Sequence, residues 1–151
     1  MNFGGHSEIQ KIPKIVSFFG IGLPKKIFAI TEGIGNHNYL VNTSGGDYIV
    51  KFLMTQTPKG IENDIAIQSQ LISVGIRTST YIQNKNGEYI DCYKGVYAVI
   101  SKKIDGVTPR YANRKLAFEI GKTLAIFHQK ITILPHPHKG WMNPDAIGIH
   151  S

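Results

Sequence analysis

The sequence predicts an α+β fold: a five-stranded antiparallel sheet with one helix against it, then a linker and a long helix. Residues 26–53 predict the first three strands, because apolar side chains alternate there and glycines mark the turns. Residues 60–74 predict the helix between the third and fourth strands, since apolar side chains recur there at helical spacing. Residues 110–131 repeat that spacing over a longer stretch and predict the final helix.

Length and composition are typical of one soluble domain. The chain has 151 residues, of which 42% are hydrophobic and 18% charged. No apolar run reaches the roughly 20 residues that a membrane span needs, and the first residues lack the pattern of a signal peptide. A single cysteine, Cys92, excludes an intramolecular disulfide. We therefore expect a cytoplasmic protein with no membrane partner.

The formal net charge of +7 raises the question of nucleic-acid binding. The 17 Lys and Arg are spread from Lys11 to Lys139, however, and never exceed two in a row. No arginine-rich run or aromatic ribonucleoprotein box accompanies them. A solvated basic surface on a protein that binds anionic nucleotides is therefore preferred over DNA or RNA binding.

The elements before and after the central strands have clear boundaries in the sequence. Residues 7–19 predict a short helix with Ser7 as its N-cap, although Pro13 should break or kink it. Residues 80–83 and 88–91 flank an Asn-Gly turn, which is a strong hairpin signal, and residues 96–101 predict another apolar strand. Residues 102–109 predict a linker. In the last helix, Gly121 indicates a close contact with another element.

The stretch from Ile30 to Phe52 places a lysine inside a strand. Gly33 and Gly35 allow the backbone to turn sharply or to approach a ligand closely. Lys51 lies further along, on the same face as the apolar residues two positions before and after it. A buried ammonium needs an anionic partner or a route to water.

Two acids, Glu62 and Asp64, are candidate partners for Lys51. Both lie in the first turn of the helix predicted over residues 60–74, where the helix dipole favours carboxylates in any case. The sequence gives the dipole role and the pairing role equal weight, and it does not say which of the two acids pairs with the lysine.

In this order, the segments resemble the small-molecule kinases of the aminoglycoside phosphotransferase, choline kinase and homoserine kinase superfamily. The segments that carry the resemblance are GIGNHNYLVNT (33–43), YIVK (48–51), QSQLISVGI (68–76), YAVIS followed by IDG (97–101 and 104–106), and IGKTLAIFH (120–128). The resemblance implies a protein-kinase-like N-lobe over residues 1–101, a hinge over 102–109, and the start of a C-lobe over 110–151 that is truncated before the catalytic loop.

The resemblance also implies roles for individual residues in binding ATP. Lys51 would contact the α and β phosphates, and Asp64 falls at the position of the helix glutamate that orients this lysine, with Glu62 as its substitute. The segments over the phosphates and along the adenine edge would contribute Gly33, Gly35, Asn36 and Asn38, and Ser101, Lys102 and Ile104, respectively.

The family's catalytic loop, H-G-D-x-x-x-x-N, and the metal-binding aspartate beyond it have no match. The only acid after His128 is Asp145, so we expect no catalytic residue and no metal-ligand set in this chain. The ligands of Mg²⁺ would lie mostly in a C-terminal half.

The expected function is the N-terminal nucleotide-binding part of an ATP-dependent phosphotransferase that acts on a hydroxyl of a small molecule, of the homoserine, choline or aminoglycoside type. The alternative is an inactive truncated remnant, or an interaction module that needs a separate C-terminal half or associates with itself. The apolar stripe of the last helix favours a partner; it comprises Leu116, Ile120, Leu124 and Phe127. Whether the chain alone is an enzyme stays open.

Overall fold

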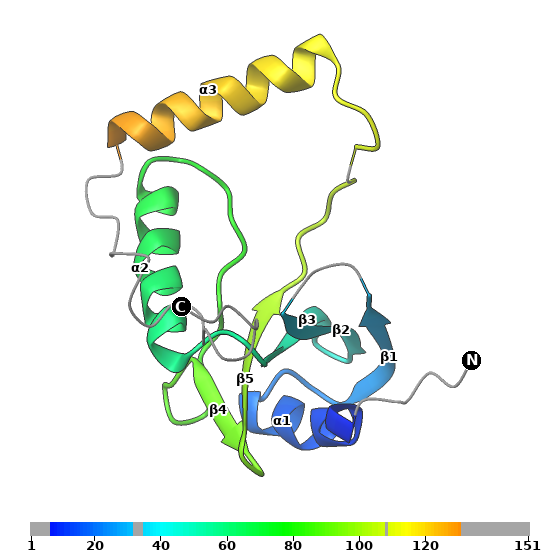
Figure 1. Ribbon diagram of the computed structural model, residues 1–151. Helices are drawn as coiled ribbons and strands as arrows, with labels where there is room; N and C mark the ends of the chain where they lie inside the picture. The colour runs from blue at the N-terminus through cyan, green and yellow to red at the C-terminus, as the bar shows by residue number, and fades with distance from the viewer. Residues whose placement is uncertain (1–6, 32–34, 108, 131–151) are drawn as a thin grey trace, which may run out of the picture.

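The computed structural model describes residues 7–31, 35–107 and 109–130 of the chain. Its five strands form one antiparallel sheet in the order β1-β2-β3-β5-β4, which confirms the predicted fold class (Figure 1). The elements in chain order are η1 (Ser7–Lys11), α1 (Ile12–Phe19), β1 (Pro24–Ile30), β2 (Asn36–Thr43), β3 (Gly46–Leu53), α2 (Pro58–Ser73), β4 (Ile90–Tyr93), β5 (Val96–Lys102) and α3 (Arg114–Lys130).

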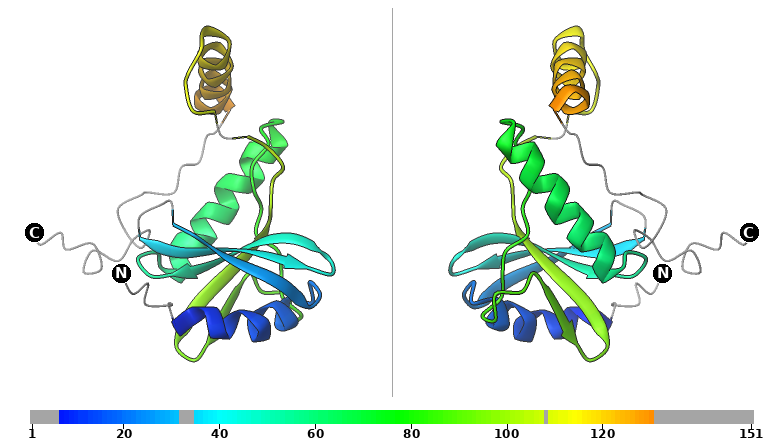
Figure 2. Two further views of the ribbon diagram at one scale, coloured as in Figure 1. Left: turned by 90° about the vertical axis from the view of Figure 1, so that its right-hand side faces the viewer. Right: turned by 90° about the vertical axis from the view of Figure 1, so that its left-hand side faces the viewer.

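Helices α1 and α2 cover opposite faces of the sheet (Figure 2). The α1 face holds the main core, because α1 presents a fully apolar side to alternating residues of the three central strands. The buried residues of this core are Ile12, Ile15, Val16, Phe19, Ile21, Tyr39, Val41, Val50, Phe52, Ala98 and Ile100.

The α2 face has a smaller core. Leu53, Ile61 and Val99 are its buried residues, and Ile65, Tyr81 and Ile90 pack against them partly buried. The smaller core follows from the sequence of α2, since Ile61 is the one large side chain of that helix that is fully buried in the described structure. Lys51 of β3, which points to this side, is therefore only half-buried.

The N-terminal helix predicted over residues 7–19 is divided into two elements. A 3-10 turn, η1, precedes α1, and Pro13 lies in the first turn of α1, where its missing N–H costs no hydrogen bond. The proline therefore starts the α-helix rather than breaking it. Gly20 ends α1 in the left-handed conformation, with φ of 67°.

The hairpin predicted around residues 80–91 forms only in part. The turn is present: the N–H of Asn84 donates to the carbonyl of Glu88 at 2.8 Å, and Gly87 has φ of 80°. Residues 80–83 are not a strand, however, because Tyr81 makes an isolated bridge to Ser101 instead of pairing with β4. Tyr81 and β4 both pair with β5 along the edge that β3 leaves open, Tyr81 at Ser101 and β4 at residues 96–99.

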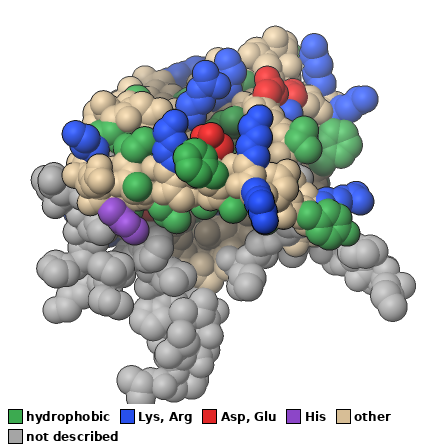
Figure 3. Space-filling model, turned by 90° about the horizontal axis from the view of Figure 1, so that it is seen from above, with side chains coloured by type: hydrophobic (Ala, Val, Ile, Leu, Met, Phe, Trp, Pro, Cys, Tyr) green, Lys and Arg blue, Asp and Glu red, His purple; other side chains and the backbone are tan. Residues whose placement is uncertain are grey.

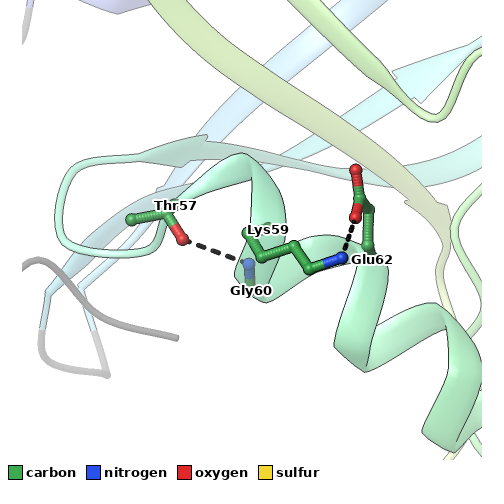
Figure 4. Close-up of polar contacts among 4 residues, drawn as sticks. All are labelled: Thr57, Lys59, Gly60 and Glu62. Atoms are coloured by element: carbon green, nitrogen blue, oxygen red, sulfur yellow. Dashed lines mark hydrogen bonds and ion pairs between the residues drawn. The ribbon is translucent and has the colours of Figure 1, made fainter. Parts of the chain in front are cut away.

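Helix α2 begins earlier than predicted, at Pro58. The hydroxyl of Thr57 accepts a hydrogen bond from the N–H of Gly60 at 3.1 Å and caps the helix (Figure 4). Glu62 and Asp64 therefore lie beyond the first turn, which contains no acid. The prediction that they sit in the first turn is wrong, and the helix dipole no longer accounts for them.

Helix α3 stands apart from the sheet and is reached through residues 103–113 (Figures 1 and 2). It begins four residues later than predicted, and none of its described residues is buried. A side chain at Gly121 would meet nothing within 4 Å, so the predicted close contact is absent from the described structure. Figure 3 looks down on this side, where Lys and Arg are dispersed among apolar side chains. Asp145 and Lys139 lie outside the described residues.

In the described part of the chain, no helix has both the length and the apolar character that crossing a membrane would require.

Candidate functional site

Lys51 is at the centre of the α2 face. Its cross-strand neighbours are Asn38 of β2 and Val99 of β5, so the lysine emerges from the middle of the sheet. The side chain is half-buried, and its Nζ donates a hydrogen bond to the hydroxyl of Tyr81 at 3.0 Å. The predicted strand lysine is therefore held toward α2 by a specific polar contact.

Asp64 is the acid that the structure brings to this lysine. The Tyr81 hydroxyl donates to Asp64 Oδ2 at 3.2 Å, and Gln56 Nε2 donates to the same oxygen at 2.7 Å. A continuous chain of hydrogen bonds therefore links the ammonium of Lys51 to the carboxylate of α2.

Glu62 does not join this group in the described contacts. Its Oε2 lies 2.7 Å from Nζ of Lys59, one turn before it on the helix surface (Figure 4). The Glu62 side chain is 60% exposed, and an exposed ion pair of this kind contributes little to stability. The suggestion that Glu62 substitutes for Asp64 therefore finds no support in the geometry.

Burial sets the protonation behaviour of the group. It lowers the pKa of Lys51, and the negative charge of Asp64 acts in the opposite direction. It raises the pKa of Tyr81, and the charge of Asp64 and its hydrogen bond raise it further. The phenol therefore keeps its proton and remains a donor to Asp64, whereas the ammonium of Lys51 is less firmly protonated than that of an ordinary lysine.

Gly35 directly precedes β2, the strand whose Asn38 pairs with Lys51. Gly35 has φ of 95°, and a Cβ there would come within 2.6 Å of Thr55 Oγ1, so this position requires glycine. Asn36 Oδ1 accepts from the N–H of Met54 at 3.0 Å, which ties the turn to the end of β3. Gly33 lies outside the described residues. Asn38 is thus the predicted turn residue that lies directly beside Lys51.

The predicted hinge residues lie at and after the C-terminal end of β5. Ser101 is buried opposite Ile49, while Lys102 is exposed. Ile104 is 55% exposed and borders a hollow of about 410 Å³ beside the C-terminal end of α2. Ser101 pairs with Tyr81, the hydrogen-bond partner of Lys51. No such bridge is described for Ile104.

A larger hollow, of about 640 Å³, lies between α2 and β4. Glu62 is the one predicted site residue in its lining, which also includes Tyr89, Asp91 and Tyr97. Size alone therefore does not identify the site, and the lysine group is the better candidate because its polar atoms converge.

The described residues contain no group of three His, Cys, Asp or Glu side chains that could hold a metal ion. Asp64 is engaged by Tyr81 and Gln56. The described part of the chain thus holds a half-buried ammonium at this site, but no cluster of three such metal-binding side chains.

Sequence comparison links the chain to curated homoserine kinases, although no family model matches it. It is 27% identical over 121 residues to the enzyme of Granulibacter bethesdensis, covering 80% of this chain and 38% of the relative. For the enzyme of Parvibaculum lavamentivorans the identity is 24%, with 92% and 44% covered, and for that of Nitrobacter hamburgensis 31%, with 79% and 37% covered. The chain thus spans less than half the length of these relatives.

Solved structures show the same fold. A spectinomycin phosphotransferase in complex with ADP and spectinomycin matches with a TM-score of 0.65 and 16% identity, over 82% of this chain and 38% of that one. An aminoglycoside phosphotransferase in complex with ADP and hygromycin B matches with a TM-score of 0.55 and 14% identity, over 85% and 40%. At this identity the likeness establishes the fold alone.

Proposed function

The chain belongs to the aminoglycoside phosphotransferase, choline kinase and homoserine kinase superfamily, and it corresponds to the N-terminal portion of these proteins. We propose that it is the nucleotide-binding part of an ATP-dependent phosphotransferase. The acceptor would be a hydroxyl group of a small molecule. Homoserine is the first acceptor to test, since the relatives reported above are homoserine kinases.

The position of Lys51 carries this proposal. A half-buried ammonium beside Asn38 would supply positive charge to a nucleotide phosphate. The phosphate charge would in turn favour the protonated lysine, against the effect of burial. Bound nucleotide and protonated Lys51 would therefore stabilise each other.

The remaining roles are proposals of the same kind. Gly33, Gly35 and Asn36 would lie over the phosphates, and the backbone of residues 101–104 would meet the adenine edge. Residues 1–101 would form the nucleotide lobe, 102–109 the hinge and 110–151 the start of the second lobe. Mg²⁺ would accompany ATP, with ligands outside the described residues, and the protein would work in the cytoplasm.

Thermal unfolding with and without MgATP tests the proposal. A ligand at 100 times its dissociation constant adds about 2.7 kcal/mol to the unfolding free energy. We expect MgATP to stabilise the wild type and the control Lys59→Ala, whose lysine is exposed on α2, but not Lys51→Ala. The same stabilisation of Lys51→Ala, or none in the wild type, would contradict nucleotide binding at this site.

The exposed apolar residues of α3 favour a second candidate, an interaction module. Phe118 is 71% exposed, Leu124 50% and Ile120 49%. Covering such apolar side chains by a partner would be favourable, because it removes their surface from water. The partner would be a separate C-terminal half or a second copy of this chain. Sedimentation velocity would show self-association of the wild type that is lost in Leu124→Lys; a concentration-independent monomer would exclude the second copy.

A further inference from the structure

The phenol of Tyr81 lies between the two charged groups of the site. Its hydroxyl accepts a hydrogen bond from Nζ of Lys51 at 3.0 Å and donates one to Oδ2 of Asp64 at 3.2 Å. A tyrosine hydroxyl is able to do both at once. The hydroxyl therefore uses both its donor and its acceptor capacity, with an ammonium on one side and a carboxylate on the other.

The backbone around Tyr81 fixes where this hydroxyl lies. Tyr81 is bridged to Ser101 of β5, and the N–H of Ile82 donates to the carbonyl of Ile100 at 2.9 Å. The tyrosine ring packs against the smaller core formed by Leu53, Ile61 and Val99. Because both the backbone and the ring are held, the hydroxyl is positioned before any ligand arrives.

The contact between Lys51 and Tyr81 is a hydrogen bond more than a cation–π interaction. Nζ lies 3.0 Å from the hydroxyl oxygen but 5.4 Å from the ring centroid, so the ammonium is beyond the hydroxyl end of the ring and not above its face. Removal of the hydroxyl alone should therefore break the contact, while the ring can stay in place.

Asp64 is held from its other side. Gln56 donates to the same Oδ2 that Tyr81 contacts, at 2.7 Å, so the carboxylate is oriented by two donors. Aspartate is one methylene shorter than the glutamate that the family resemblance implies at this position. The Tyr81 hydroxyl contacts both this carboxylate and the ammonium of Lys51.

On the basis of the proposed nucleotide-binding function, we propose that Tyr81 is a positioning residue that couples Asp64 to Lys51 and holds the ammonium ready for a nucleotide phosphate. The arrangement replaces a simple carboxylate–ammonium pair by a three-residue relay drawn from α2, the segment before β4, and β3. The raised pKa of Tyr81 supports it, since a protonated phenol stays a donor over the physiological pH range.

The first experiment measures the pKa of Lys51 without nucleotide, by NMR titration of the full chain labelled at the lysine ε-carbon. Asp64→Asn should lower this pKa by removing a negative charge, and Tyr81→Phe should lower it by removing the acceptor of the ammonium. In the double variant, the pKa of Lys51 should fall by less than the sum of the two single decreases, because the phenol carries part of the effect of Asp64. Tyr97→Phe, at an exposed tyrosine of β5, is the matched control. An unchanged pKa in Tyr81→Phe, or strictly additive effects, would overturn the inference.

The second experiment measures MgATP affinity by calorimetry on the same variants, after circular dichroism confirms that they are folded. Tyr81→Phe should weaken binding about tenfold, the size expected for one hydrogen bond to a charged group, and Tyr97→Phe should leave it unchanged. Wild-type binding that Tyr81→Phe retains in full would refute the role of Tyr81 and leave the proposed function standing. Failure of the wild type to bind would refute the proposed function, and the titration of Lys51 would still decide whether Tyr81 couples the two charges.

Discussion

The two faces of the sheet are built differently although the same strands supply both. On the α1 face, eleven buried residues form one apolar core, and alternating residues of β2, β3 and β5 are among them. On the α2 face the described core has only three buried apolar side chains, and a lysine, a tyrosine and an aspartate lie beside them. Neighbouring residues of β3 thus serve opposite purposes: Val50 and Phe52 belong to the core, and Lys51 between them belongs to the site.

This difference separates the part of the sheet that stabilises the fold from the part that carries the candidate site. Apolar packing supplies most of the free energy of folding, and here it is concentrated on the α1 face. The α2 face is therefore free to hold a half-buried ammonium, whose burial costs stability. The comparison predicts that substitutions on the α1 face change stability and those on the α2 face change nucleotide binding.

The largest expected effect is on the α1 face. Phe52→Ala should lower the unfolding free energy by about 3–5 kcal/mol, because the ring is fully buried and packs edge-to-face on Tyr39. Urea unfolding measures this. Leu53→Ala, at the next residue and on the other face, is the control and should cost less. Equal losses in the two variants would break the comparison between the faces.

Lys51→Met should separate stability from binding. The methionine fills similar space without a charge, and Asp64 keeps Tyr81 and Gln56 as donors. The unfolding free energy should therefore stay within about 1 kcal/mol of the wild type, while stabilisation by MgATP disappears. Urea unfolding with and without MgATP measures both quantities. A large loss of stability in the absence of nucleotide would show that Lys51 is a structural residue after all.

The pH dependence of the wild type should carry the signature of Lys51. Its pKa in the folded protein lies below the ordinary value of 10.5, so over the interval between the two the unfolded chain binds the proton more strongly. The cost of burying the charge is full below the folded-state pKa and disappears as the pH rises to the unfolded-state pKa. Relative to Lys51→Met, wild-type stability should therefore rise across that interval, while MgATP affinity falls.

Urea unfolding of the two proteins at a series of pH values tests this sign directly. A difference in unfolding free energy that stays constant with pH would mean that the pKa of Lys51 is not lowered by folding.

The smallest expected effect concerns the second acid. Glu62→Gln should change stability by about 0.5 kcal/mol or less, because Glu62 forms an exposed ion pair with Lys59, and MgATP affinity should not change. Asp64→Asn is the matched substitution inside the relay and should weaken MgATP binding. If calorimetric titration shows that Glu62→Gln weakens MgATP binding more than Asp64→Asn does, Glu62 is the functional acid of α2.

Much of the fold could be predicted because its signals are local. Alternation along residues 26–53 and the glycine turns predict β1 to β3, and Lys51 stands out as a charge on an apolar face. Residues 80–83 show the limit of such signals, since their pattern fits a strand and yet they form one bridge to β5. β4 pairs with residues 96–99 of β5, and Tyr81 reaches the same edge only at Ser101, so the partner of each segment depends on the whole sheet and not on its local pattern.

The candidate site was predictable only in part, for a similar reason. Asp64 and Glu62 are two positions apart, and the choice between them depends on helix phase and on Tyr81, which arrives from a distant segment. No local pattern marks Tyr81 or Gln56 as a polar partner. Tyr81 is 30 residues from Lys51 in the sequence, and Gln56 is 8 residues from Asp64. The need for glycine at position 35 could still be anticipated, since Gly35 has a positive φ.

The strand order has a consequence for how the chain acquires its structure. Strands β1, β2 and β3 are neighbours both in sequence and in the sheet, whereas β3 reaches β5 only after α2 and β4 have been inserted between them. Short loops close at lower entropic cost than long ones, so the meander of residues 24–53 is expected to form in the folding transition state and β5 to dock later. Lys51 would then be in place on its strand before Tyr81 and Asp64 reach it.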